Sequence, residues 1–88
     1  MKNPYKIVEI ITYKNGQKRF NILDRCRTWI AANNAYRRFT ADDSGYTDDE
    51  ICDIARDIAA FYSIALYDTV DKQIYRERVY IENGVRYE

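Results

Sequence analysis

The pair Asn15-Gly16 constrains the fold of this 88-residue chain more than any other short segment. It separates two runs of mainly β-branched, aromatic and aliphatic residues, 5–13 and 17–23. Asn-Gly readily takes the positive φ angles of a two-residue type I′ turn, and two such runs around it are typical of a β-hairpin. The sequence therefore predicts an antiparallel hairpin at the start of the chain.

A type I′ turn also fixes which residues face each other across the hairpin. Ile11 would lie opposite Phe20 and Glu9 opposite Ile22, and the core face would consist of Ile7, Ile11, Phe20 and Ile22. The reverse face would carry Val8, Ile10 and Leu23. Another element or a partner would have to cover this reverse face, unless it stays partly in water.

Two helices are predicted next. The first would begin after Asp24, a good N-cap residue, and end near residues 39–40, because apolar side chains recur at helical spacing at Trp29, Ala32, Tyr36 and Phe39. Thr47 and Glu50 form a capping box at the start of the second helix. Its broad apolar face would extend to about Tyr67 and marks it as the central helix.

The last part of the chain is predicted to return to the sheet. Residues 73–82 alternate in polarity as a strand does, and a second Asn-Gly pair at 83–84 would turn residues 85–88 back as a short further strand. The predicted fold class is α+β, a small antiparallel sheet in the order β-β-α-α-β-(β) with two helices packed on one face. Residues 1–88 would form a single domain.

Composition excludes much catalytic chemistry. The chain has no histidine, which excludes every histidine-based dyad or triad and most common metal sites. Cys26 and Cys52 are expected to be buried free thiols, and the alternative for Cys26 is a reactive thiol whose pKa is lowered by Arg25 and Arg27. Glu9 is a candidate acid–base group on the core face, unless it lies at the rim or pairs with an arginine such as Arg25. We expect no enzyme activity, no cofactor and no metal.

The location of the protein is inferred from its first residues. Residues 1–11 become charged too soon for a signal peptide or a membrane span. A single pair of cysteines is also sparse for a secreted chain of this size. We therefore expect a cytoplasmic protein that makes no contact with a membrane.

Charge is strongly segregated although the formal net charge is zero. Residues 1–40 hold nine Lys and Arg against two Asp and Glu, and residues 41–88 hold five against twelve. Either the two halves neutralise each other within the fold, or the molecule presents one basic and one acidic surface.

The acidic half contains the candidate partner-binding residues. Seven carboxylates fall within residues 42–57 with only Arg56 against them, first in a predicted loop and then along the exposed strip of the second helix. Such a row steers association with a basic surface, and the nine tyrosines add contact area. The predicted function is binding, and inhibition or modulation, of a protein partner with a basic surface. The candidate residues are Asp42, Asp43, Asp49, Asp53 and Asp57. A merely solvated helix face is the alternative interpretation.

Two other kinds of interaction stay open. The basic half would bind nucleic acid through Arg25, Arg27, Arg37 and Arg38, although a net charge of zero is low for a dedicated nucleic-acid binder. A homodimer would form through Val8, Ile10 and Leu23, or by contact between the basic half and the acidic half.

The composition also resembles a known group of proteins. In size, lack of histidine, tyrosine content and the acidic run from Asp42 to Asp57, the chain resembles the small inhibitor proteins of phages and mobile elements, including anti-CRISPR proteins. The likeness is one of size and composition and includes no motif. It implies a one-domain inhibitor that binds a nucleic-acid enzyme, and it assigns no functional residue.

Overall fold

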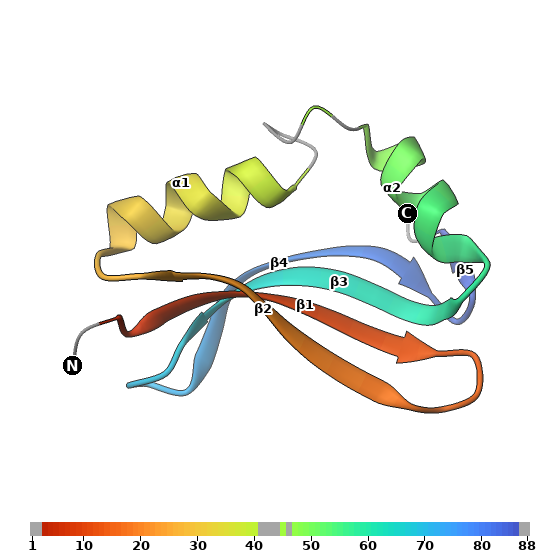
Figure 1. Ribbon diagram of the computed structural model, residues 1–88, viewed down its shortest axis with the longest axis horizontal. Helices are drawn as coiled ribbons and strands as arrows, with labels where there is room; N and C mark the ends of the chain where they lie inside the picture. Colours follow the sequence, from red (N-terminus) through yellow and green to blue (C-terminus); the bar gives the residue numbers. More distant parts are fainter. Residues whose placement is uncertain (1–2, 41–44, 46, 87–88) are drawn as a thin grey trace.

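Five antiparallel strands form one sheet in the order β2-β1-β3-β4-β5 (Figure 1). The computed structural model describes residues 3–40, 45 and 47–86. Along the chain the elements are β1 (Tyr5–Tyr13), β2 (Lys18–Cys26), α1 (Trp29–Phe39), α2 (Asp48–Arg56), β3 (Ala59–Asp68), β4 (Gln73–Glu82) and β5 (Val85–Arg86).

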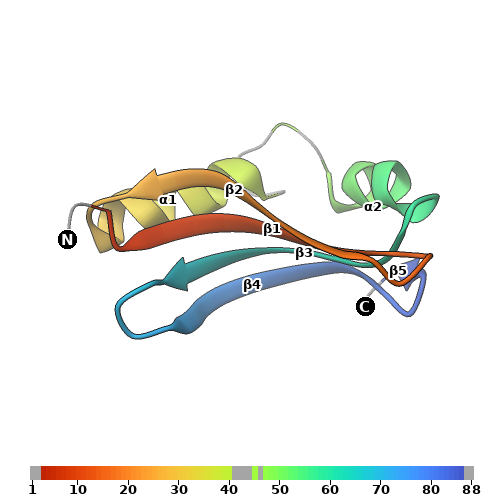
Figure 2. The ribbon, with the colours of Figure 1, turned by 60° about the horizontal axis from the view of Figure 1, so that its bottom comes forward.

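Both helices lie on the same face of the sheet (Figure 1 and Figure 2). α1 contacts β1, β2 and β3, and α2 contacts β3, β4 and β5. The predicted α+β class, with an antiparallel sheet and two helices on one face, is therefore confirmed. The sheet has one strand more than the predicted order.

The hairpin of β1 and β2 forms as predicted, but its turn is of another type. The N–H of Tyr13 donates to the carbonyl oxygen of Gln17 at 2.8 Å, and the N–H of Gly16 donates to the carbonyl oxygen of Tyr13 at 2.9 Å. Gly16 has a φ of 91°, whereas Asn15 is not among the residues with positive φ. This pattern is a type I turn followed by a glycine bulge, not the predicted type I′ turn.

The different turn shifts the register by one residue and exchanges the faces of β2. Phe20 lies opposite Ile10 and Ile22 lies opposite Val8. Because side chains alternate along a strand, such a shift moves every one of them to the other face. The predicted core positions of Phe20 and Ile22 are wrong, since these side chains are 65% and 41% exposed. Leu23, predicted for the reverse face, packs against the core beside a bulge.

The second predicted helix is too long. α2 ends at Arg56, and Ala59–Asp68 form β3, which lies between β1 and β4. Ser63 and Ala65 on one face of β3 and Leu66 on the other are all 0% exposed. A strand buried on both faces appears in the sequence as a continuous apolar run, which periodicity alone does not distinguish from a buried helix.

The first helix begins later than predicted. β2 continues through Cys26, so Thr28 rather than Asp24 is the N-cap of α1, and its hydroxyl accepts a hydrogen bond from the N–H of Ala31 at 3.1 Å. The predicted apolar side of the helix is confirmed at Ala32, Tyr36 and Phe39, which pack in or against the core. The prediction is wrong for Trp29, which is 43% exposed.

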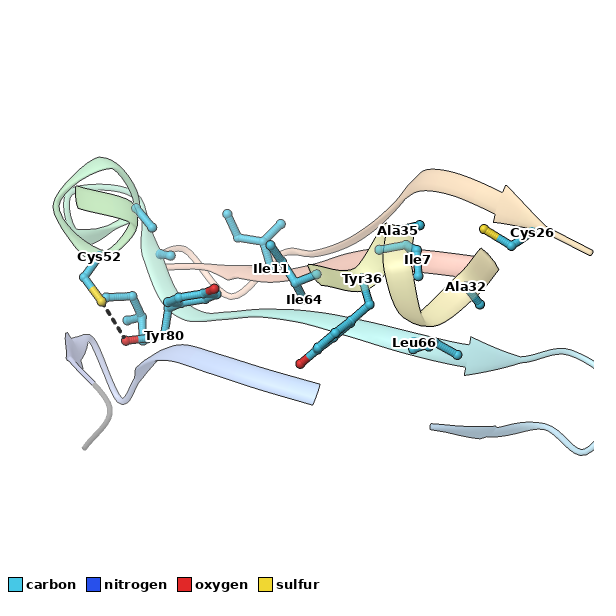
Figure 3. Close-up of a cluster of buried hydrophobic side chains, with 13 residues drawn as sticks. Ile7, Ile11, Cys26, Ala32, Ala35, Tyr36, Cys52, Ile64, Leu66 and Tyr80 are labelled. Atoms are coloured by element: carbon cyan, nitrogen blue, oxygen red, sulfur yellow. Dashed lines mark hydrogen bonds between the residues drawn. The ribbon is translucent and has the colours of Figure 1, made fainter. Parts of the chain in front are cut away.

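The core fills the space between the helices and the sheet (Figure 3). Three of its large aliphatic members, Ile7, Leu66 and Ile81, are 0% exposed. They come from β1, β3 and β4, the three inner strands of the sheet, against which the helices pack. Burial of such side chains is the main stabilising contribution in a domain of this size.

Both cysteines are buried free thiols, as predicted. The Sγ of Cys52 donates a hydrogen bond to the backbone oxygen of Tyr80 at 3.3 Å (Figure 3). Burial, and then the charge of Asp24, raise the pKa of Cys26. The alternative of a reactive Cys26 thiol with a lowered pKa is therefore wrong.

Candidate binding surfaces

The face of the sheet opposite the helices is not covered by any described element (Figure 2). We call it the open face. A shallow groove of about 460 Å³ crosses it from β2 to β4 and is lined by Lys6, Val8, Ile10, Phe20, Ile22, Tyr67 and Ile74. Side chains of β1, β2, β3 and β4 therefore meet on this face.

The open face is apolar at its centre. Phe20 and Ile22 on β2 and Ile74 on β4 are 65%, 41% and 48% exposed. Between them, β3 contributes the small residues Ser63 and Ala65, which lie opposite Ile10 and Val8 of β1. Large side chains on the outer strands and small ones on β3 leave the face slightly hollow.

Charges on the open face are divided between its two sides. Lys6 and Arg25 pair across β1 and β2, and Lys18 lies at the other end of β2. On β4, Glu77 lies opposite Ala65 and accepts a hydrogen bond from the Ser63 hydroxyl at 2.6 Å. Glu82 follows Ile81, which faces the helices, so alternation places Glu82 on the open face as well. The cations therefore lie on β1 and β2, and the carboxylates lie on β4.

The acidic strip predicted for partner binding lies partly on α2. The N-terminus of α2 is capped as predicted, because the Thr47 hydroxyl accepts a hydrogen bond from the Glu50 N–H at 3.2 Å. Asp49, Asp53 and Asp57 are all exposed on α2 or at its C-cap. Asp42 and Asp43 lie outside the described residues.

Two carboxylates of this strip are paired with arginines. Arg86 of β5 binds Asp49, and Arg56 binds Asp53 at 2.7 Å. Both arginines come from the C-terminal half, so they are not the cations expected from residues 1–40. The pairing reduces the negative potential that a basic partner would meet at α2.

The four arginines predicted for nucleic-acid binding are exposed but do not share one surface. Arg25 pairs across the strands with Lys6, which lines the open face. Arg37 and Arg38 lie in the last turn of α1, on the helix side, where Arg38 lies 3.9 Å from Asp24. Arg27 lies between β2 and α1. The sheet thus separates Arg25 from Arg37 and Arg38.

Comparison with known proteins identifies no relative. No family model matches the chain, and neither the curated proteins nor the solved structures include a match. Within the described residues, no group of three or more Cys, Asp or Glu side chains is placed to hold a metal ion. None of the described helices has the length and apolarity needed to cross a lipid bilayer.

Glu9 lies on the helix side of β1, as predicted, but not with the predicted partner. Its carboxylate accepts hydrogen bonds from Asn21 Nδ2 at 2.9 Å and from the Tyr62 hydroxyl at 2.6 Å. Arg25 lies on the opposite face, so the suggested ion pair with Glu9 is wrong. Burial and the hydrogen bond to Glu9 raise the pKa of Tyr62 above its ordinary value, so its hydroxyl is a hydrogen-bond donor throughout the neutral range.

Sequence reasoning missed the contribution of Phe20, Ile22 and Ile74 to the open face. The type I′ turn predicted from the sequence places the first two in the core. A glycine at position 16 also allows a three-residue loop with a glycine bulge, in which only Gly16 needs a positive φ. This loop moves the register by one residue and so predicts that Phe20 and Ile22 lie on the open face.

Proposed function

We propose that this chain is a non-catalytic binding protein that forms a homodimer by packing the open faces of two sheets together. The observation that carries the proposal is the cluster of Phe20, Ile22 and Ile74, exposed on a face that no described element covers. Apolar side chains clustered in this way are typical of protein contact surfaces. Two sheets packed face to face form a β-sandwich with about 10 Å between them.

The area of the open face is suitable for a dimer. Four strands spaced about 4.8 Å apart, each nine or ten residues long, cover about 19 Å by about 30 Å. The flat area of the face is therefore about 600 Å² per copy, and the uneven surface of the side chains increases it. A stable protein interface buries about 800 Å² per partner, so the open face is close to the area required.

The charges favour one arrangement of the two copies. A twofold axis parallel to the strands places β2 of each copy over β4 of the other, which brings one cation of β2 over a carboxylate of β4. Lys18 would then lie near Glu82 of the second copy, because both lie at the same end of the sheet. An axis perpendicular to the strands would place β2 over β2 and bring Lys18 near Arg25. The net charge of zero adds no overall repulsion between copies.

Pairing through the edge of the sheet is disfavoured. β2 is the long edge strand, and its exposed residues include Lys18, Arg19 and Arg25. In an antiparallel pairing of two β2 strands centred on Ile22, Arg19 would lie opposite Arg25 of the other copy. Charged side chains on an edge strand oppose such pairing, so the face is the better contact surface.

The dimer keeps the helices on its two outer sides. The acidic residues of α2, including the exposed Asp57, would then be displayed once on each side and stay accessible to a basic partner protein. We also place the protein in the cytoplasm, because Cys26 and Cys52 are both free and such a compartment keeps thiols reduced.

A charge exchange tests the arrangement. Lys18→Glu places two carboxylates together on each side of the interface and is expected to weaken the dimer about 3- to 10-fold. The double variant Lys18→Glu, Glu82→Lys restores the attraction and is expected to bind nearly as well as the unmodified protein. Sedimentation equilibrium gives the dissociation constants.

Two results would count against this proposal. Sedimentation of the unmodified protein at its monomer mass of 10.5 kDa up to millimolar concentration would rule out the dimer. Weaker dimerisation of the double variant than of Lys18→Glu alone would rule out the proposed twofold arrangement.

A further inference from the structure

A cleft of about 320 Å³ lies on the helix side of the sheet, away from the open face. The end of α1, the inner side of α2 and strands β1 and β3 surround it. Its apolar walls include Ile11, Phe39, Ile51, Ile54, Ile58 and Ile64. Its volume and apolar lining correspond to those of small-molecule sites in other proteins, which add only a few polar groups.

Among the described residues that line this cleft, one is charged. Glu9 is half-buried on β1, and its two carboxylate oxygens are held by Asn21 on β2 and Tyr62 on β3. Both hydrogen-bond donors are neutral, so they orient the carboxylate without cancelling its charge. Across the described ranges, no lysine or arginine forms an ion pair with Glu9. The cleft thus combines an apolar wall with a carboxylate that forms no ion pair among the described residues.

Aromatic rings accompany this carboxylate. Tyr13, Phe39 and Tyr62 all line the cleft with Glu9. The face of an aromatic ring attracts a cation, and this attraction increases when water is excluded. Rings and a carboxylate in one apolar cleft favour a ligand that carries positive charge on an apolar body over a neutral or anionic ligand of the same shape.

We propose that this cleft binds a small protonated amine with an apolar body, such as an arylalkylamine. Its ammonium group would donate to Glu9, and its apolar part would lie against Ile51, Ile54 and Ile58. Each carboxylate oxygen accepts more than one hydrogen bond, so the ammonium can bind while Asn21 and Tyr62 stay in place. This inference goes beyond the homodimer and does not depend on it, because the cleft and the open face lie on opposite sides of the sheet.

The probe for the test is phenethylamine, titrated into the ¹⁵N-labelled protein and followed by amide chemical shifts. We expect saturable shifts at residues that line the cleft, Ile54 and Ile58 among them. Two control ligands separate the contributions. 3-Phenylpropionate has a similar apolar body with a negative charge, and ethylamine has the charge without the ring. Both are expected to bind at least about tenfold more weakly.

Variants then test the residues. Glu9→Gln keeps an oxygen acceptor for one of its two neighbours but removes the charge, and it is expected to weaken phenethylamine binding at least about tenfold. Ile54→Ala, at a side chain that is 70% exposed at the rim, should also weaken binding without disturbing the core. Asp71→Asn is the control, because Asp71 is exposed between β3 and β4 and does not line the cleft, and it should bind phenethylamine as the unmodified protein does.

Several outcomes would overturn the inference. These are the absence of saturable shifts with phenethylamine, equal binding of 3-phenylpropionate, or unchanged binding in a folded Glu9→Gln variant. If Glu9→Gln fails to fold, unchanged binding in Ile54→Ala overturns it instead. The monomeric variant Phe20→Glu should bind phenethylamine normally, so failure of the homodimer and failure of the amine site can be told apart.

Discussion

Phe20→Glu is expected to convert the dimer to a monomer, weakening association by about 100-fold or more. Phe20 lies on β2 within the proposed contact between the open faces. A carboxylate at this position would lose its water on association without gaining a cation, at a cost of about 3 kcal/mol or more, and about 1.4 kcal/mol corresponds to each tenfold change. Sedimentation equilibrium measures the change as a fall toward the chain mass of 10.5 kDa.

The control for Phe20→Glu is Ile30→Glu. Ile30 is 73% exposed, like Phe20 at 65%, but it lies on α1 on the other side of the sheet. Both substitutions add one carboxylate at an exposed position and leave the core intact, which circular dichroism can verify. The dimer is expected to survive Ile30→Glu. Equal dissociation by the two variants would show that general charge, and not the open face, governs association.

Leu66→Ala is expected to lower the free energy of unfolding by about 2 to 5 kcal/mol. Leu66 is 0% exposed on the helix side of β3, where it belongs to the core below the helices (Figure 3). Its truncation removes apolar contacts and leaves a cavity that the three inner strands close only in part. Urea denaturation at one fixed protein concentration gives the value, since dimerisation couples stability to concentration.

The matched control for Leu66→Ala is Ile30→Ala. It also shortens an aliphatic side chain, but at an exposed position of α1, and it should change stability by no more than about 0.5 kcal/mol. A loss below about 1 kcal/mol for Leu66→Ala would contradict the central place of β3 in the sheet, which is the main departure of the fold from the sequence-based expectation.

The fold could be predicted from the sequence where local chemistry is decisive. Thr47 stands before a first turn rich in acidic residues, and it caps α2. The spacing of Ala32 and Tyr36 identified the buried side of α1. The β-hairpin around Gly16 was also recognisable, because strand-forming runs flank the turn.

The rest depended on tertiary structure. Residues 59–68 are apolar in both the strand and the helix interpretation, and only their position between β1 and β4 makes them a strand. The turn at Asn15-Gly16 allows two hairpin types. In the register that forms, Ile7 and Ile11 pack in the core below the helices, and Phe20 lies on the open face. That choice determines which surface is available for binding.

The candidate sites were predictable only in part. Glu9 stood out in the sequence as a carboxylate among apolar residues, but its partners Asn21 and Tyr62 come from neighbouring strands whose pairing was not known. The exposed position of Asp53 on its helix was also predictable. The pairing of Asp49 with Arg86 was not, because it joins residues far apart in the chain.

The most direct test of the homodimer is an isotope-filtered NOE measurement on a mixture of labelled and unlabelled protein. Phe20 and Val79 lie at the same level of the sheet but are separated by three strand spacings, about 14 Å, within one chain. The twofold arrangement brings Phe20 of one copy over Val79 of the other. It predicts intermolecular NOEs between these two side chains. Intermolecular NOEs confined to α1 or α2, or none at Phe20, would contradict the proposed interface.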